Sequence, residues 1–314
     1  MPRLGETALD VCHLCLGGNV FGWTADEQAS FAVLDAYAEA GGNFIDTADS
    51  YSAWVPGHSG GESETTIGRW IAARGNRDQI VIATKVGQKP DRRGLSAPNI
   101  RAAAEESLER LQTDRIDLYY AHIDDAETPL EETLNAFTEL IAEGKVGYVA
   151  ASNYGAERLT EALRTSERAG LARYVALQTH YSLVERHLYE GELLAVCEGE
   201  RLPCIPYWVL AMGFLTGKYR PGTTVDSPRA GGAGQYLDDR GLAVLAALDA
   251  IAATHETTVA AVALAWTAAQ PTVLSPIASA RSSEQLAGLL PMLELELTAD
   301  ELAALDAASA DDEP

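Results

Sequence analysis

The sequence predicts an α/β fold, a closed (β/α)8 barrel of the TIM type. Eight short β-rich runs alternate with helical segments along the chain, which is the pattern of a parallel sheet. Most of these runs are apolar throughout, as strands covered on both faces are. At 314 residues the chain has an ordinary length for one such barrel. We therefore expect a single domain over residues 1–314, with a short β segment at its N-terminus and a helix at its C-terminus.

The expected strands are short runs of mostly β-branched, aromatic and other apolar residues. They cover residues 11–17, 43–46, 80–85, 116–122, 146–152, 174–178, 203–207 and 272–277. Eight such units favour a closed barrel over a doubly wound open sheet. The open sheet stays an alternative, because the order of strands cannot be read from the sequence. No G-x-G-x-x-G motif follows an early strand, since GGNVFG at 17–22 lacks the spacing, and this weakens the alternative further.

The expected helices carry apolar residues at spacings of three and four. They cover residues 27–41, 63–74, 97–111, 129–144 and 155–170. Gly41, Gly144 and Gly170 stand at the ends of three of these segments, where a left-handed residue commonly closes a helix.

The charge balance argues against large anionic partners. The chain has 46 acidic and 23 basic residues, a formal net charge of -23. Such a surface repels nucleic acid and acidic lipid, but a local positive pocket can still hold a small anionic cofactor. No apolar run is long enough for a signal peptide or a membrane span. We expect a cytoplasmic protein, monomer or homo-oligomer, that acts on a small molecule.

The four cysteines predict no metal site. Cys12 and Cys15 form a CxxC pair, but no second pair follows at a matching spacing. On a strand, an offset of three also points the two thiols to opposite faces. We expect these cysteines to pack in the core.

Polar residues gather where the expected strands end. Asp46, Lys85 and His122 close three of them in succession, and Tyr51 follows Asp46 in NFIDTADSYS. In a barrel these ends open on one face, where such enzymes place their chemistry. A buried aspartate is costly unless it is paired, and Lys85, one strand over, is its candidate partner. Taken singly, a solvated lysine, a core histidine or an interface tyrosine is the usual reading, but their coincidence favours a site.

Together these four side chains suit the protonation of an alkoxide. A tyrosine hydroxyl has a free pKa near 10, and a nearby ammonium such as Lys85 makes it a better proton donor. Asp46 can hold Lys85, and His122 can orient the substrate oxygen. Such a set fits the reduction of a carbonyl with Tyr51 as general acid. None of these groups can deliver a hydride, so a nicotinamide cofactor is implied.

Several stretches resemble the successive motifs of the aldo-keto reductases, including the branch that contains the potassium-channel β-subunits. The resemblance runs from about Leu14 to Leu290 and rests on NFIDTADSYS, IATKVG, DLYYAH, ASNYG, LQTHYSLVER and LAMGFLTGKY. It implies a (β/α)8 barrel with one NADP(H) bound across the carboxyl-terminal face. It also implies the catalytic tetrad Asp46, Tyr51, Lys85 and His122.

The same resemblance implies a cofactor site. Ser152, Asn153 and Gln178 match residues that hydrogen-bond the nicotinamide carboxamide, and Tyr207 matches the residue that stacks on its ring. The loop over the pyrophosphate is implied to contain Leu210, Gly213, Leu215 and Lys218. The group around the adenosine 2′-phosphate is implied to contain Ser279, Arg281 and Gln285.

The chain departs from the family pattern near the expected pocket. Trp208 stands where relatives commonly have a small polar residue, and Leu289 where many carry an asparagine. The loop 52–63 is longer than the link in many relatives. We expect the substrate pocket to be walled by Trp23, Trp54, His58 and Trp208. For the loop residues Trp54 and His58, a structural turn built on Pro56-Gly57 and Gly60-Gly61 is an equally good explanation.

The leading hypothesis is an NADPH-dependent reductase of aldehydes or ketones. A regulatory subunit that binds the cofactor and serves a membrane partner is the rival class, and the acidic chain with no basic docking surface argues against it. A tailoring reductase of nucleotide sugars or polyketides is a third possibility, inside the same chemistry.

Overall fold

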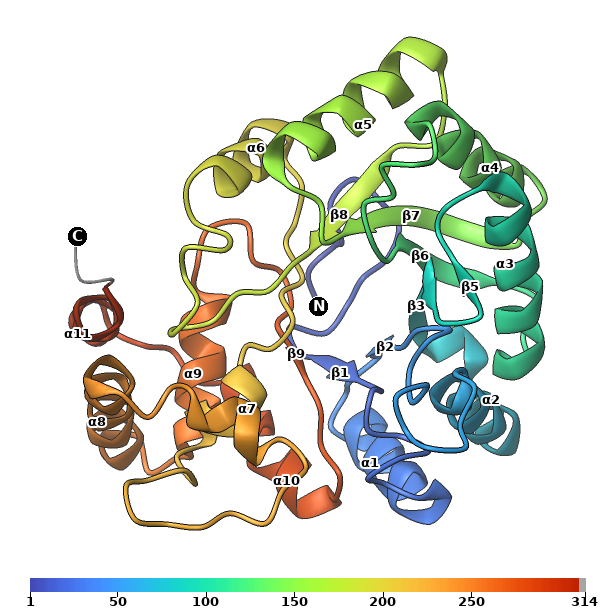
Figure 1. Ribbon diagram of the computed structural model, residues 1–314. Coiled ribbons are helices and arrows are strands. Elements are labelled where there is room, and N and C mark those ends of the chain that lie inside the picture. The colour runs from blue at the N-terminus through green and yellow to red at the C-terminus, as the bar shows by residue number, and fades with distance from the viewer. Residues whose placement is uncertain (311–314) are drawn as a thin grey trace.

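The structure, a computed structural model, describes residues 1–310 and consists of a curled sheet surrounded by helices (Figure 1). All seven strands of the main sheet are parallel, in the order β8-β7-β6-β3-β2-β1-β9. They are β1 (Cys15–Gly17), β2 (Phe44–Asp46), β3 (Val81–Val86), β6 (Ile116–Ala121), β7 (Val146–Ser152), β8 (Tyr174–Gln178) and β9 (Ile277–Ala278). Their order follows the chain without the reversal of a doubly wound sheet. The prediction of a (β/α)8 barrel is confirmed.

The predicted strand at 203–207 is wrong as a regular strand. The segment runs between β8 and β9 and joins its neighbours through isolated bridges, Leu177 to Cys204 and Cys204 to Val273. Pro203 and Pro206 have no N–H to donate, so a continuous ladder cannot form there. Their carbonyl oxygens still accept hydrogen bonds from Leu177 and Ile277 at 3.0 and 2.8 Å. The ring therefore closes through this irregular segment.

The first and the last expected strands along the chain are also shorter than predicted. Residues 11–14 lie outside β1, and of the expected run 272–277 only its last residue belongs to β9. Pro276 again explains the loss, because it lacks the N–H that a ladder needs. A bridge between Arg3 and Asp10 provides the short N-terminal β segment.

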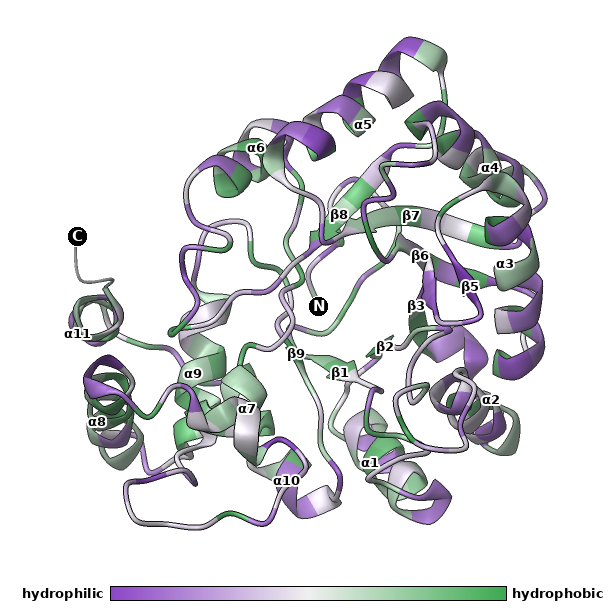
Figure 2. Ribbon diagram, in the orientation of Figure 1, coloured by the Kyte–Doolittle hydropathy of each residue, from purple (hydrophilic) through white to green (hydrophobic). Residues whose placement is uncertain are grey.

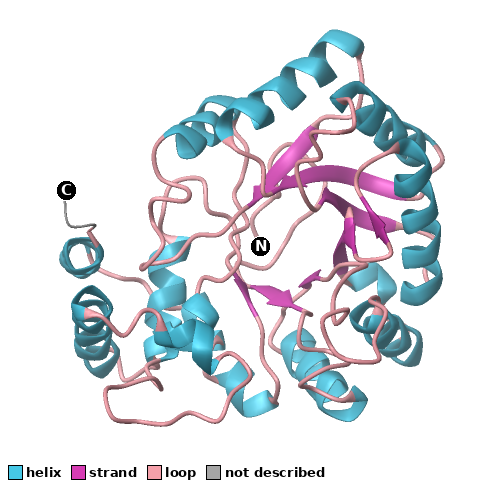
Figure 3. Ribbon diagram, in the orientation of Figure 1, coloured by secondary structure: helices cyan, strands magenta, loops and turns pink. Residues whose placement is uncertain are grey.

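Helices pack around the outside of the sheet (Figure 3). The five expected helices are confirmed as α1 (Glu27–Glu39), α2 (Glu62–Arg74), α3 (Ala97–Leu111), α4 (Leu130–Ala142) and α5 (Ala156–Ala169). They are followed by α6 (Glu192–Glu200), α7 (Ala230–Gly234), α8 (Asp239–Thr254), α9 (Val259–Ala268), α10 (Ser283–Ala287) and the C-terminal α11 (Ala299–Ser309). Gly41, Gly144 and Gly170 have φ of 84°, 74° and 65°, the left-handed conformation expected after α1, α4 and α5.

Short elements complete the chain. They are the hairpin of β4 (Gln88–Lys89) and β5 (Arg92–Arg93) and the 3-10 turns η1 (Arg77–Gln79), η2 (Ala211–Thr216) and η3 (Leu290–Leu293). Within residues 1–310 no single helix has the length and apolar character to cross a membrane; α8 and α9 meet that test only as a pair, and they are bent by 101°.

The core has two parts separated by the sheet. Inside the barrel lies a small cluster that includes Phe44, Leu118, Tyr120 and Ile205, and a larger cluster fills the space between sheet and helices. Hydrophobic colour on β8 and α9 and hydrophilic colour along α5 reflect this layering (Figure 2). Cys12, Cys15, Cys197 and Cys204 are buried and unpaired. This packing leaves the carboxyl ends of the strands to carry the polar residues.

Candidate active site

Asp46 and Lys85 meet at the ends of β2 and β3. The Lys85 Nζ atom lies 2.6 Å from Asp46 Oδ2, and both side chains are buried. The ammonium also donates to the Thr47 carbonyl oxygen and to the Tyr51 hydroxyl, each at 2.8 Å. All three of its donors are therefore used. Gln178 at the end of β8 donates to the other carboxylate oxygen of Asp46 at 2.8 Å, so neither oxygen is left bare.

A turn brings Tyr51 over this pair. The Asp49 N–H donates to the Lys85 carbonyl and the Tyr51 N–H to that of Ala48, so the chain folds back after β2. The Tyr51 hydroxyl donates to Asp46 Oδ2 at 3.1 Å and accepts from Lys85. The hydroxyl therefore lies between a carboxylate and an ammonium.

The acidity of Tyr51 differs from the prediction. We expected Lys85 to lower the pKa of Tyr51, but burial and then the Asp46 carboxylate raise that pKa well above its usual value. Burial lowers the pKa of Lys85, while Asp46 opposes this effect. The sequence predicts that Lys85 lies near Tyr51, but it does not reveal that the Tyr51 hydroxyl donates a hydrogen bond to Asp46. The structure thus holds Tyr51 in its protonated form, the form that a general acid needs.

His122 follows β6 beside Tyr51. Its ring centroid lies 6.2 Å from that of Tyr51, with an angle of 69° between the planes. Burial and the Lys85 charge hold the pKa of His122 well below its usual value, so the ring is neutral near pH 7. The backbone carbonyl accepts from Asn153 Nδ2 at 2.9 Å, whereas Nδ1 has no hydrogen-bond partner among residues 1–310. A neutral ring without such a partner suits the orientation of a substrate oxygen.

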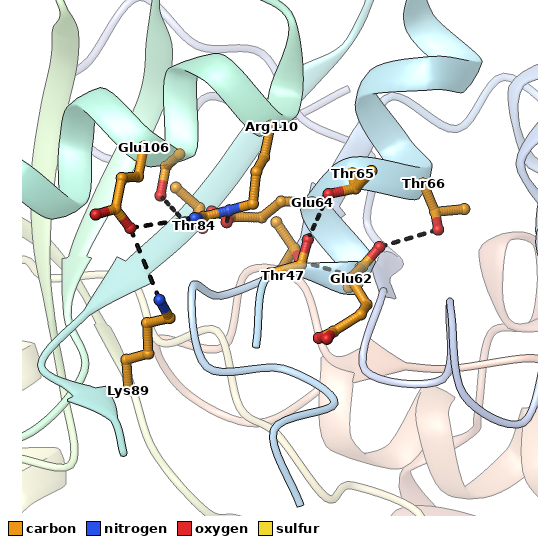
Figure 4. A network of polar contacts seen from close by, with 12 residues as sticks. Thr47, Glu62, Glu64, Thr65, Thr66, Thr84, Lys89, Glu106 and Arg110 are labelled. Carbon is orange, nitrogen blue, oxygen red and sulfur yellow. Dashed lines mark hydrogen bonds and ion pairs between the residues drawn. The ribbon is translucent and has the colours of Figure 1, made fainter. Parts of the chain in front are cut away.

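An ionic network that centres on the buried Glu64 lies behind β3 (Figure 4). Glu64 on α2 accepts from Thr84 on β3 at 2.5 Å and from Arg110 on α3 at 2.7 Å. Glu106, also on α3, contacts Arg110 at 3.3 Å and Lys89 at 3.7 Å. The network ties two helices to the strand that carries Lys85.

Asp49 is a buried acid that forms no hydrogen bond with this network. Its side chain is inaccessible, and neither carboxylate oxygen has a hydrogen-bond partner among residues 1–310. Burial, and next the Glu64 carboxylate, raise the pKa of Asp49 to about 7, although Arg110 acts in the other direction. The carboxyl group belongs to the turn between Asp46 and Tyr51.

A cavity of about 640 Å³ opens above these residues. The four residues assigned to the nicotinamide line it, and they come from the ends of β7 and β8 and from the segment after them: Ser152, Asn153, Gln178 and Tyr207. The Tyr207 hydroxyl donates to Asn153 Oδ1 at 2.8 Å, and Asn153 adopts a left-handed φ of 60°. These groups satisfy one another at the wall of the cavity.

Three cations line the same cavity: Lys218, Arg229 and Arg281. No carboxylate among residues 1–310 forms an ion pair with any of their side chains. Burial lowers the pKa of Lys218, and Arg281 and Arg229 lower it further. Like charges held together without a counter-ion fit an anionic ligand. The donor set therefore suits the phosphates of a dinucleotide.

The other residues assigned to the adenosine end lie nearby. Ser279 Oγ donates to Asn19 Oδ1 at 2.7 Å, and the Arg281 N–H donates to Gln285 Oε1 at 3.0 Å. Ser279, Gln285 and Leu289 all line the cavity.

Three predicted site residues do not line the cavity. Lys85 is fully buried beneath Tyr51 and reaches the cavity only through the tyrosine hydroxyl. Leu210 and Gly213 line the cavity, but Leu215 is fully buried in the core beneath them. His58 turns to Glu62, with 3.9 Å between Nδ1 and Oε1. Gly57, Gly60 and Gly61 have φ near 90°, so the structural turn accounts for this part of the loop.

The three tryptophans assigned to the substrate pocket line the cavity. Trp23 and Trp54 pack edge to face with their centroids 5.5 Å apart, and Trp54 lies 6.1 Å from Tyr51. Trp208 lies against His180 and Tyr207 with centroid distances of 5.1 and 5.5 Å. The catalytic tyrosine candidate therefore faces an aromatic wall.

The sequence model of the aldo/keto reductase family matches residues 13–310. The chain belongs to this family. It is 35% identical to the uncharacterized oxidoreductase YrpG of Bacillus subtilis over 94% of this chain and 91% of that protein. It is 33% identical to the protein Tas of Escherichia coli over 97% of this chain and 96% of that protein. An aryl-alcohol dehydrogenase of Pestalotiopsis microspora is 31% identical over 95% of this chain and 78% of that protein.

Membership of the aldo/keto reductase family makes this chain an oxidoreductase that reduces small carbonyl compounds with a nicotinamide cofactor. Sequence reasoning missed two residues of this reductase. Arg229 stands in SPRAGG, a stretch with no motif, and only its place in the long connection after Lys218 signals it. Asp49 is in NFIDTADSYS, where its neighbours Asp46 and Tyr51 drew the attention.

Proposed function

We propose that this aldo/keto reductase uses NADPH to reduce an aldehyde or ketone to an alcohol, with Tyr51 as the general acid. The observation that carries the proposal is the Tyr51 hydroxyl, which lies 2.8 Å from Lys85 Nζ at the wall of the cavity. It is a protonated donor beside a fixed positive charge. That is the arrangement that carbonyl reduction requires.

The proton moves from Tyr51 to the substrate oxygen. The cofactor, when bound, supplies the hydride to the carbonyl carbon. As the hydroxyl proton leaves, the Lys85 ammonium stabilises the phenolate that remains. Asp46 holds Lys85, and Gln178 holds Asp46 from the opposite side. His122, neutral near pH 7, donates a ring N–H to the same oxygen and fixes its direction.

Different residues of the cavity are suited to different parts of the cofactor. When the cofactor is bound, Ser152, Asn153 and Gln178 would hold the carboxamide, and Tyr207 would lie against the nicotinamide ring. Lys218 and Arg229 would hold the pyrophosphate through charged hydrogen bonds. Leu210 and Gly213 belong to the loop above it.

The preference for NADPH rests on Arg281. A net charge of -23 disfavours the more anionic of the two cofactors unless a specific cation compensates. A planar guanidinium can grip a phosphate with two parallel hydrogen bonds, and Arg281 has no carboxylate partner among residues 1–310. Ser279 and Gln285 add neutral groups.

A carbonyl screen tests the proposal. NADPH absorbance is followed with aldehydes, ketones, diketones and keto-sugars as substrates, and NADPH affinity is measured separately by titration. Steady NADPH consumption with at least one carbonyl class supports a reductase. Tight NADPH binding without turnover of any carbonyl would instead indicate a cofactor-binding subunit.

A further inference from the structure

A continuous aromatic wall runs along the cavity to the Tyr51 hydroxyl. Trp23 contacts Trp54, Trp54 contacts Tyr51, and Tyr51 contacts His122, with centroid distances of 5.5, 6.1 and 6.2 Å. All four residues line the cavity. A flat ring placed against this wall meets aromatic edges and faces in the arrangements that aromatic pairs prefer.

Two tryptophans of the cavity are unusually exposed. Trp54 is 52% and Trp208 42% exposed, and they are the only two tryptophans among the exposed large hydrophobic residues of the described chain. Trp54 belongs to the long loop 52–63, and Trp208 belongs to a separate cluster with His180 and Tyr207. Uncovered tryptophan surface in a cavity is apolar area that a ligand can remove from water.

The backbone of Trp208 supports a role for its side chain. Its φ is 54°, a left-handed conformation that is a real outlier for a bulky residue. A glycine or asparagine would adopt it more easily, and strained residues of this kind cluster at binding sites. The ring of this strained residue lines the cavity.

The acidic residues of the cavity argue against amines as substrates. Two carboxylates line it, Asp46 and Glu284. Asp46 is committed to Lys85 and Gln178, and Glu284 lies on α10 with the adenosine-end residues. Among residues 1–310, no other carboxylate lines the cavity to hold an amine. The polar residues Ser152, Asn153 and Gln178 belong to the proposed nicotinamide site. Of the other polar side chains that line the cavity, Asn19 is bonded to Ser279 and Gln88 to the His122 carbonyl oxygen.

We propose that the substrates are uncharged, planar aryl aldehydes or ketones, and that Trp54 selects them by stacking on the aryl ring. The inference rests on the proposed carbonyl reduction at Tyr51. The ring lies against Trp54, Trp208 covers apolar surface from the second cluster, and the carbonyl oxygen points to the Tyr51 hydroxyl. Trp54 is thus a specificity-determining residue.

The test compares substrates that differ in planarity. Benzaldehyde and cyclohexanecarboxaldehyde have the same number of carbon atoms, and kcat/KM for each is measured with NADPH for wild type, Trp54→Ala and Trp54→Phe. The ratio between the two substrates cancels general losses of activity. We expect the ratio to shift away from benzaldehyde by about 2- to 13-fold in Trp54→Ala, the range for one aromatic pair, and by less in Trp54→Phe. Leu188→Ala, which removes an exposed apolar side chain outside the cavity, keeps the wild-type ratio.

A binding measurement separates this inference from the proposed reaction. The NADP+-loaded protein is titrated calorimetrically with benzyl alcohol and with cyclohexylmethanol. Tighter binding of the aryl alcohol by wild type but not by Trp54→Ala supports the inference even if no carbonyl is turned over. Equal affinities for the two alcohols, or a kinetic ratio that is the same in wild type and Trp54→Ala, would overturn it.

Discussion

The Nζ atom of Lys85 lies 2.6 Å from Oδ2 of Asp46 where two neighbouring parallel strands end. The pair is buried, so each charge depends on the other. The Lys85 ammonium also donates a hydrogen bond to the Tyr51 hydroxyl. Tyr51 lines the cavity, so this bond links the buried ion pair to the cavity.

Removing the lysine charge changes how Tyr51 titrates. Oxidation of an alcohol needs Tyr51 as a base, so its rate rises with the fraction of phenolate. Without the ammonium at 2.8 Å the phenolate is less stable, and we expect the oxidation profile of Lys85→Met to move to higher pH with a lower rate near pH 7. Lys89→Met, which removes a lysine paired with Asp91 and Glu106, serves as the control. An oxidation profile of Lys85→Met that coincides with wild type contradicts the role of Lys85.

Asp49 makes stability depend on pH. Its pKa in the folded protein is about 7, against about 3.9 for a free aspartate. Between these values the unfolded chain has released a proton that the folded chain keeps, so stability falls by about 1.4 kcal/mol per pH unit as pH rises, and is constant above about pH 7. Asp49→Asn removes this dependence.

Urea unfolding at pH 5 and pH 8 measures the effect. Relative to wild type, Asp49→Asn gains free energy of unfolding on going from pH 5 to pH 8. Other titrating groups cancel, because only the difference between the two proteins is compared. The same difference at both pH values would show that Asp49 is ionised throughout.

Cofactor selectivity isolates Arg281. A charged hydrogen bond contributes about 1.5 to 3 kcal/mol, which is roughly 10- to 150-fold in affinity. Arg281→Ala weakens NADPH binding by about that factor and leaves NADH nearly unchanged. Arg229→Ala is the matched comparison, because the pyrophosphate is common to both cofactors and both affinities should fall. Fluorescence titrations decide it, and equal losses of NADPH and NADH in Arg281→Ala refute the placement.

His122 acts by direction rather than by titration. The pKa of His122 is held well below its usual value, so the ring does not change its charge near pH 6.5. We therefore expect the pH profile of kcat/KM for reduction to have the same shape near pH 6.5 in wild type and in His122→Gln. We expect His122→Gln to retain substantial activity with activated aldehydes and to fail with hindered ketones. Complete indifference of both substrates to the change argues against any role.

Parallel strands explain how much of the site the sequence predicts. Asp46, Lys85, His122 and Gln178 lie at or next to the ends of strands of one sheet, and the carboxyl ends of parallel strands meet at one edge. The spacing of apolar residues at three and four positions likewise predicts the helices α1 to α5. These features depend on local pattern and on topology alone.

The remainder depends on tertiary contacts that leave no periodic trace. The prolines at 203 and 206 interrupt a run that reads as a strand. The pKa of Tyr51 depends on which group its hydroxyl meets, and the place of Arg229 depends on the path of an irregular loop. His58 illustrates the opposite error, because a polar aromatic residue near a pocket can turn to a neighbour such as Glu62 instead.

The most direct test of the account is a single-turnover measurement with Tyr51→Phe. The protein is loaded with NADPH and mixed with an excess of an aldehyde that wild type reduces, and the loss of nicotinamide absorbance is followed. We predict a rate lower by about 10²-fold or more with an unchanged Kd for NADPH, because only the transferable proton is removed. Tyr154→Phe, which removes a buried hydroxyl bonded to Tyr174, keeps the wild-type rate. A Tyr51→Phe protein that binds NADPH normally and retains most of the wild-type rate would contradict the central claim.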